Sequence, residues 1–325
     1  MKSLPITLLL AGLSVAGLAQ NAVVREQTAL KNLESKRVTL PNGWSLTPVG
    51  RSLPLGDLPL NMVAAPGKRP LLAVTNNGQS KQTVQLIDWK AEKLLSEIEI
   101  PKSWVGIRFS PDAKKLYVSG GNDNRIVIYD LANDQLTESG AITLGKPWPV
   151  KISVAGIELN AAGTTLYAAT KEDSSVYVCD IASGQISSRL KLTAEPYAIL
   201  RSPVSDELYI SLWGGEKVLI YSPGQQKITA EVPTGSHPND MVVTRDGRYL
   251  FTANANDNSV SVIDLKSRKV IESLNTALYP DAPAGSTPNG LALSPDQKKL
   301  FIANADNNCL AVFDVGTPGR SRSLG

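Results

Sequence analysis

Short apolar runs separated by polar turns cover most of the chain. Residues 234–264 read TGSHPNDMVVTRDGRYLFTANANDNSVSVID, in which three apolar runs are divided by an Arg-Asp-Gly turn and a loop rich in Asn and Asp. Short runs with turn residues about every eight to twelve positions are typical of antiparallel strands. The pattern therefore predicts an all-β protein.

The residue that ends every third run fixes the repeat length. These residues are Asp88, Asp130, Asp180, Ser222, Asp264 and Asp314, so the intervals are 42, 50, 42, 42 and 50 residues. A period near 40 predicts a β-propeller of four-stranded antiparallel blades. Six repeat units lie between Pro54 and Gly325, with insertions before the third unit (145–154) and before the sixth (275–287).

The first 53 residues fall outside the repeats. Residues 1–19 combine Lys2, an apolar segment and small residues, which predicts a secretory signal peptide and a periplasmic or secreted protein without a membrane span after cleavage. The alternative is a membrane anchor, although the apolar run is short for a bilayer. Residues 20–43 are the expected N-terminal arm, whose polar part, 20–37, could form either a short helix or an irregular segment. Residues 44–53 resemble a fourth strand and are the candidate closing strand, so that the propeller covers 44–325.

Composition and charge narrow the function classes. Apolar residues make up 42% and charged residues 19%, and the net charge of +3 comes without a basic stripe that alternates with aromatic residues. Such a chain is not expected to bind nucleic acid. The single histidine, His237, cannot build a multi-histidine metal site, and no motif for a cofactor is present, so we expect neither metal nor cofactor.

Two further residue classes are interpreted as structural. Asp and Asn in the turns bond to nearby backbone and are favoured there for that reason. Cys179 and Cys309 belong to the third strands of units three and six, too far apart for a disulfide, and we expect two buried free thiols.

The repeats resemble a known family. LAVTN (72–76), LFTAN (250–254) and LFIAN (300–304), together with SPD turns and a closing VID or VFD, are similar to the YVTN-repeat β-propellers. The pair SHPNDM (236–241) and YPDAPAGSTPNGLALSPD (279–296) resembles a narrower group of secreted bacterial proteins. In that group the propeller precedes an alkaline-phosphatase-like phosphoesterase domain. The resemblance implies seven blades in an intact protein and a phosphoesterase domain in cis if this chain is a fragment.

One face of the propeller gathers the side chains that break the repeat. In a four-stranded blade, the connection between blades and the loop between strands two and three emerge on the same face. Large or polar residues at these places are the candidate ligand-binding set: Trp104, Trp148, Tyr197, Trp213, His237, Asn239, Asp240, Tyr279 and Asn289. A small polar ligand, a glycan or a partner domain would suit them. The alternative is that the aromatic rings only cap the packing between blades.

Two functions of different class follow. In the first, the propeller is a binding or scaffold module without catalysis of its own, auxiliary to the phosphoesterase domain. In the second, it is a lactonase-like hydrolase whose site lies at the channel mouth and uses His237 and Asp240. The second function needs an acid, a base and an oxyanion-binding group together, and one histidine supplies little of this.

Overall fold

The computed structural model describes residues 51–279 and 282–325, together with residues 28, 31–32, 34–39, 43 and 45–46. The chain divides into two compact units, Met1–Pro54 and Leu55–Gly325. In the first unit, β1 (Val38–Thr39) pairs antiparallel with β2 (Ser45–Leu46). Within the described residues, no helix has the length and apolar character needed to cross a membrane.

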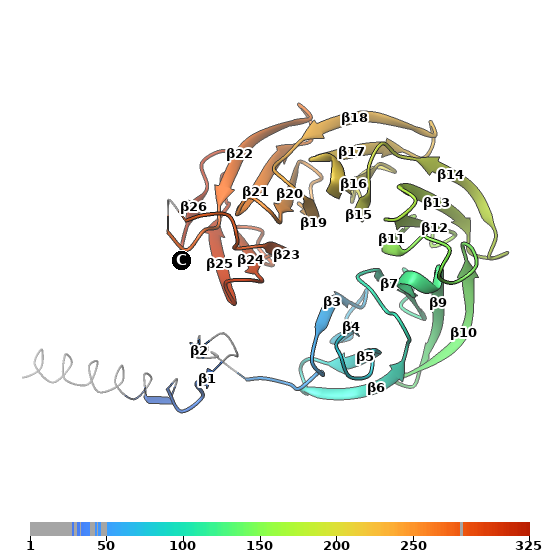
Figure 1. Cartoon of the computed structure of the whole chain (residues 1–325), viewed down its shortest axis with the longest axis horizontal. Helices are drawn as coiled ribbons and strands as arrows, with labels where there is room; N and C mark the ends of the chain where they lie inside the picture. Colours follow the sequence, from blue (N-terminus) through green and yellow to red (C-terminus); the bar gives the residue numbers. More distant parts are fainter. Residues whose placement is uncertain are drawn as a thin grey trace, which may run out of the picture. The chain divides into compact units, whose positions relative to one another are not determined.

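The second unit is the predicted propeller of four-stranded antiparallel blades, and six are present (Figure 1). Blades one to three comprise β3 (Pro59–Ala64), β4 (Leu71–Asn76), β5 (Thr83–Asp88) and β6 (Lys93–Glu99); β7 (Ile107–Phe109), β8 (Lys115–Ser119), β9 (Arg125–Ala132) and β10 (Gln135–Thr143); and β11 (Val154–Leu159), β12 (Thr165–Thr170), β13 (Ser175–Asp180) and β14 (Ile186–Lys191). Blades four to six comprise β15 (Pro196–Arg201), β16 (Leu208–Leu212), β17 (Lys217–Ser222) and β18 (Lys227–Pro233); β19 (Pro238–Val243), β20 (Tyr249–Asn254), β21 (Ser259–Asp264) and β22 (Lys269–Asn275); and β23 (Pro288–Leu293), β24 (Lys299–Asn304), β25 (Cys309–Asp314) and β26 (Arg322–Ser323).

The aspartates that end the third strands hold the turns that follow them. The Asp264 carboxylate accepts the backbone N–H groups of Lys266 and Ser267, both at 2.9 Å. Asp88 does the same for Lys90 and Ala91 at 2.9 and 2.8 Å. A carboxylate that satisfies two N–H groups fixes the turn into the outermost strand. The structural interpretation of these repeated aspartates agrees with this geometry.

Consecutive blades are joined by apolar packing between their sheet faces. Five clusters of buried side chains each span one pair of neighbours, from blades one and two through to blades five and six. Phe251 of blade five and Leu300 of blade six, for example, belong to one cluster and are fully buried. None of these clusters, within the described chain, joins blade six to blade one.

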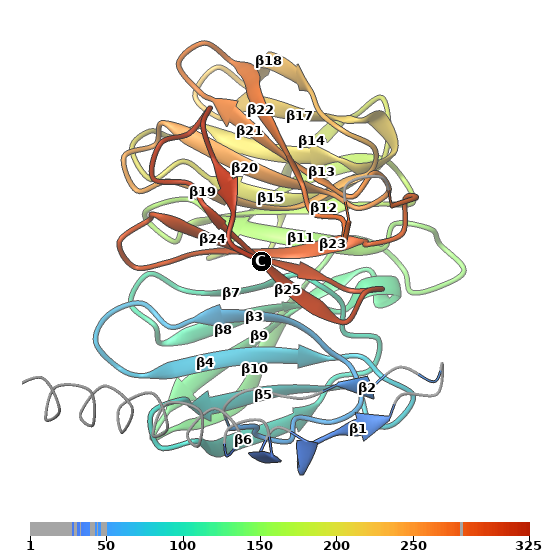
Figure 2. The ribbon, with the colours of Figure 1, turned by 90° about the vertical axis from the view of Figure 1, so that its left-hand side faces the viewer.

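Blades one and six instead border a groove of about 380 Å³. Met62 of blade one and Leu310 of blade six line it, and each is 56% exposed. Figure 2, seen from this side, shows the strands of both blades facing the viewer. Apolar side chains that are buried between the other pairs of blades are thus partly exposed between blades six and one.

The two cysteines differ in burial. Both thiols are free, and Cys179 is buried, which raises the pKa of its thiol to about 11. Cys309, on β25 of blade six, is only half-buried, so the expectation of two buried thiols was wrong for this residue. The reason is that the fourth strand is short: β26 pairs with Phe313 and Asp314, at the other end of β25, so on that side no described strand lies beside Cys309.

The candidate closing strand, residues 44–53, lies only partly among the described residues. Its described portion includes β2, which pairs with β1, while residues 51–53 lie outside any strand. The fourth position of blade six is taken by β26, which pairs with β25. Closure by residues 44–53 and the seventh blade both stay predictions.

Glycines allow the innermost strands to approach one another closely. A Cβ on Gly156 of β11 would lie 2.6 Å from the carbonyl oxygen of Tyr197 on β15. A Cβ on Gly290 of β23, by contrast, would have Ala303 Cβ at 3.7 Å as its nearest neighbour. The glycine is therefore required by blade packing at the first position and not at the second.

We predict that Gly156→Ala lowers the free energy of unfolding by about 2 kcal/mol, because the added methyl group forces blades three and four apart. The matched change Gly290→Ala should leave it within about 0.5 kcal/mol of the parent. Urea unfolding of the three proteins measures both values. Equal losses for the two variants would contradict the prediction and would indicate that a further element packs against β23 in solution.

Candidate functional site

The innermost strands of the six blades surround a central channel, which contains a cavity of about 240 Å³. Three of the predicted residues line it, namely Tyr197, Asp240 and Asn289, and each comes from a different blade. Arg108 of the second blade and Asn61 of the first line it too. The cavity therefore has a polar lining drawn from distant parts of the sequence.

Asp240 is a partly buried carboxylate of β19 within this channel. Its Oδ2 accepts the backbone N–H of Leu291 on β23 at 2.8 Å, so it links blades five and six. Burial raises the pKa of Asp240, an effect opposed by the N–H groups of Leu291 and Met241 and by the charge of Arg108. Burial, together with the Asp240 charge, also raises the pKa of Tyr197 to about 12. Tyr197 is consequently a neutral hydrogen-bonding group at physiological pH.

Arg108 and Glu158 form an ion pair beside the channel. The Arg108 Nε lies 3.1 Å from Glu158 Oε2, and a second guanidinium N–H donates to the carbonyl of Ile107 at 2.9 Å. Glu158 is 9% exposed, and Arg108 is the cation that pairs with this nearly buried carboxylate. Sequence reasoning missed both residues. The available signal was that Gly-Ile-Arg (106–108) and Gly-Ile-Glu (156–158) place opposite charges at one position of consecutive units.

Asn239 and Asn289 tie together the strands that border the channel. The Asn239 side-chain NH₂ donates to Asn289 Oδ1 at 2.6 Å, and Asn239 Oδ1 accepts the N–H of Asp240 at 2.6 Å. Asn239 is buried, whereas Asn289 is exposed toward the cavity that it lines. The pair therefore fixes the backbone that carries Asp240.

Four of the predicted residues form two aromatic contacts. Trp104 meets Tyr197 edge-on with ring centroids 6.2 Å apart. Trp213 meets His237 edge-on at 4.4 Å, and His237 Nδ1 lies 2.8 Å from Ser236 Oγ. These ring contacts agree in part with the alternative interpretation, in which the aromatic side chains serve packing and not ligand binding.

The remaining two predicted residues stand apart from these contacts. Trp148 and Tyr279 belong to the two insertions and are 56% and 58% exposed. Neither lines the channel cavity. Each insertion is held by a buried asparagine with a left-handed backbone: Asn124 binds the carbonyls of Lys146 and Val150, and Asn258 accepts N–H groups from Gly285 and Ser286.

No group of three or more His, Cys, Asp or Glu side chains placed to hold a metal ion occurs in the described part of the chain. The fold and the channel define a β-propeller with a polar cavity at its axis. A profile of the YNCE-like beta-propeller family matches residues 13–324, and the chain belongs to this family.

Individual relatives are distant. The chain is 22% identical over 179 residues to the uncharacterized protein YncE of Salmonella typhi, and to that of Salmonella typhimurium, which is 54% of this chain and 49% of each relative. The chain thus spans about half the length of the curated relatives it matches. Hydrazine synthase of Kuenenia stuttgartiensis is similar in structure, with a TM-score of 0.64, 20% identity, and coverage of 80% of this chain and 78% of that one.

A functionally unknown protein of Desulfotomaculum acetoxidans has a TM-score of 0.62 at 13% identity, with 77% of each chain covered. Identities this low show a shared fold alone. They do not show a relation to proteins that carry a phosphoesterase domain.

We predict that Asp240→Asn makes the protein more stable at pH 7. The folded-state pKa of Asp240 is raised, so below the usual value of 3.8 the carboxyl is neutral in both states and costs nothing, and stability falls as the pH rises through the folded-state pKa. An amide retains an oxygen for the Leu291 N–H without this cost. Urea unfolding at pH 7 and near pH 4 should show the gain shrinking at the lower pH.

Asp246→Asn is the matched control of opposite sign. The hydroxyl of Thr244 and the N–H of Arg248 lower the pKa of Asp246, so its contribution to stability is present at pH 7 and is lost on acidification. This variant should be less stable than the parent at pH 7. A loss of stability in Asp240→Asn at pH 7 would contradict the inference that burial raises the pKa of Asp240.

Proposed function

We propose that this protein is an exported binding or scaffold module whose ligand enters the channel face of the propeller. One observation carries the proposal: Arg108, Tyr197 and Asp240, from three different blades, line a single cavity. Concave sites with a few convergent polar groups are where proteins usually bind small molecules. The hydrogen bond from the Leu291 N–H to Asp240 and the side-chain hydrogen bond from Asn239 to Asn289 would hold the Asp240 and Asn289 side chains in place without rearrangement.

The lactonase-like alternative is less well supported. His237 packs on Trp213 and bonds to Ser236, whereas Asp240 lines the channel cavity and binds the backbone of Leu291. A hydrolase of this kind needs its base and its other reacting groups within reach of one substrate atom. Separate environments for these two side chains favour binding over hydrolysis.

The wider context of the module is part of the proposal. The apolar N-terminal segment supports export to the periplasm or out of the cell, and the SHPNDM and YPDAPAGSTPNG stretches support a role auxiliary to a phosphoesterase domain. In that role the propeller would shape access to the domain that performs the reaction. Small polar molecules or glycans are the proposed ligands, and nucleic acid is not.

For the reaction itself, we predict that the parent, Asp240→Ala and His237→Ala all open a lactone such as γ-butyrolactone at the rate of buffer alone. A pH-stat assay measures the rate, and melting temperatures establish that each variant is folded. If the parent opened the lactone well above the buffer rate, and if this rate fell at least tenfold in both variants, the binding proposal would be overturned in favour of the hydrolase.

For the context, we predict that the coding sequence beyond the codon for Gly325 continues into a further repeat and then a phosphoesterase-like region. In cells that express the full coding sequence, N-terminal sequencing of the mature protein should begin at Gln20. A stop codon directly after Gly325 would contradict the auxiliary role. An uncleaved N-terminus would contradict export through a removed signal peptide.

A further inference from the structure

A second cavity of about 450 Å³ opens at the channel face, between blades one, two and three. We call it the rim cavity. The residues that matter for its chemistry are Lys102, Trp104, Asn122, Ser153, Lys171 and Glu172. Only Trp104 belongs to the set chosen from the sequence.

The charges of the rim cavity favour an anion. The cavity is lined by two lysines, Lys102 and Lys171, and by one glutamate, Glu172, so it carries a local excess of one positive charge. Neither lysine forms an ion pair with a carboxylate in the described part of the chain. Lys171 instead lies with its Nζ 4.3 Å from the ring centroid of Trp213. A cation–π contact uses none of the N–H donors of the ammonium group, so these donors remain available to a ligand.

The uncharged lining favours a ligand with many hydroxyl groups. Gln82, Asn122 and Ser153 supply amide and hydroxyl groups around the cavity, and Gln82 Oε1 is buried without a hydrogen-bond partner among the described groups. Trp104 adds an aromatic surface. The rim cavity offers amides, a hydroxyl and an indole, and it has only a small excess of positive charge. These properties suit a sugar acid better than a densely charged polyphosphate chain.

The walls of the rim cavity are held in place before any ligand arrives. Ser153 Oγ donates to Asn122 Oδ1 at 2.5 Å, and the backbone N–H groups of Lys171 and Glu172 donate to the carbonyls of Ser153 and Ile152 at 3.0 and 3.1 Å. The insertion before blade three is thereby bonded to the loop that carries Lys171.

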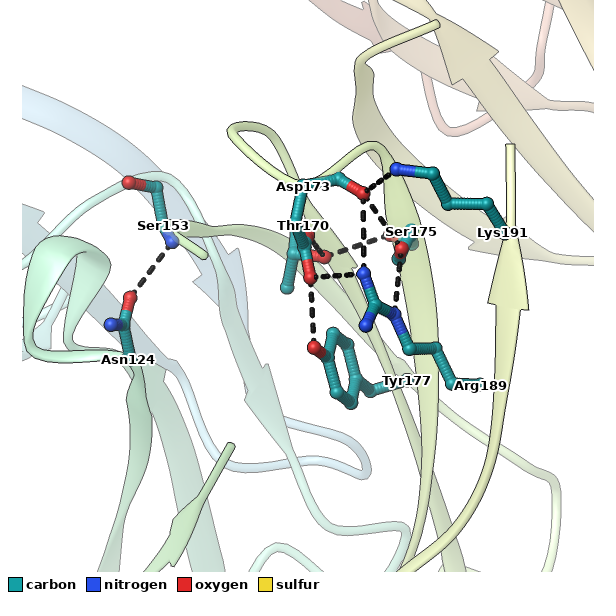
Figure 3. A network of polar contacts seen from close by, with 8 residues as sticks. All are labelled: Asn124, Ser153, Thr170, Asp173, Ser175, Tyr177, Arg189 and Lys191. Atoms are coloured by element: carbon teal, nitrogen blue, oxygen red, sulfur yellow. Dashed lines mark hydrogen bonds and ion pairs between the residues drawn. The ribbon is translucent and has the colours of Figure 1, made fainter. Parts of the chain in front are cut away.

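That loop is also fixed from the side of its own blade, as Figure 3 shows. The carboxylate of Asp173 accepts hydrogen bonds from Thr170 Oγ1 at 2.5 Å, from Tyr177 OH at 2.8 Å and from Arg189 at 2.8 Å. The backbone carbonyl of Asp173 also accepts from Lys191 Nζ at 2.5 Å. A loop bonded this often loses little freedom when a ligand binds, so less binding energy is spent on ordering it.

We propose that the rim cavity binds an acidic saccharide, with a sugar carboxylate between Lys102 and Lys171 and the sugar ring near Trp104. This deepens the proposed binding function, on which it rests, by naming the ligand class at the channel face. The carboxylate receives charge-assisted hydrogen bonds from the two ammonium groups, and Asn122 and Ser153 serve the hydroxyls.

Calorimetric titration with tri-galacturonate and with its methyl ester tests the proposal, because the two probes differ in charge and share the sugar hydroxyls. The parent should bind the acid at least about tenfold more tightly than the neutral ester. Lys102→Gln and Lys171→Gln should each weaken binding of the acid about fivefold, whereas Glu172→Gln should tighten it about twofold. Binding of the ester should change little in all three variants.

Lys90→Gln is the matched control, since Lys90 also lies over an indole, at 5.5 Å from the ring of Trp89, on a turn outside the rim cavity. It should bind both probes as the parent does. Equal affinity for acid and ester, or equal losses in the control and the cavity variants, would overturn the acidic-saccharide proposal. The binding function itself is tested separately, by the lactone assay. Tighter binding of an oligodeoxythymidylate than of the acid would overturn the acidic-saccharide proposal in favour of a single-stranded nucleic acid.

Discussion

The packing of one blade's sheet face on the next is the interaction on which this molecule depends. A four-stranded blade has two faces, and a sheet with an apolar face is stable only when another layer covers it. In blade five both faces are covered, so that nearly every residue of β20 and β21 is buried. Burying a side chain such as Phe251 contributes about 2 kcal/mol, and each interface contains several of this size. The channel exists because these interfaces set the angle between neighbouring blades.

The frame repeats more strictly than the chemistry does. The closing positions Asp88, Asp130 and Asp180 recur 134 residues later at Ser222, Asp264 and Asp314, since 222 − 88, 264 − 130 and 314 − 180 are all 134. The asparagines that hold the insertions, Asn124 and Asn258, keep the same spacing and the same left-handed backbone. The described propeller is therefore built as two similar halves of three blades.

In the channel this correspondence ends. At the spacing of 134, Gly106 corresponds to Asp240, Arg108 to Val242, and Glu158 to Ala292. A residue that served only the blade frame would be needed equally in both halves. The charged groups of the channel and the lysines of the rim cavity occur once each, which is the distribution expected for an asymmetric ligand site.

The fold was predictable because its causes are local and repeated. Turn residues such as Asp264 and the alternation of apolar runs occur six times, so that one ambiguous unit, the one closed by Ser222, does not obscure the period. The site was predictable in part. Tyr197, Asp240 and Asn289 stood out as departures from the repeat, and they do line one cavity. Trp148 and Tyr279 stood out equally and lie exposed on insertions, because size alone does not tell a lining residue from a surface one.

What the sequence could not supply were relations between blades. The pairing of Arg108 with Glu158 crosses from one sheet to the next, and both residues look like ordinary surface charges when each strand is taken alone. The position of Lys171 depends on Asp173, whose carboxylate accepts a hydrogen bond from Arg189 on β14, the outermost strand of the same blade. A loop of blade three therefore places the Lys171 ammonium group at the rim cavity, which blades one, two and three share. The position of this group follows from the assembled blades and not from any one strand.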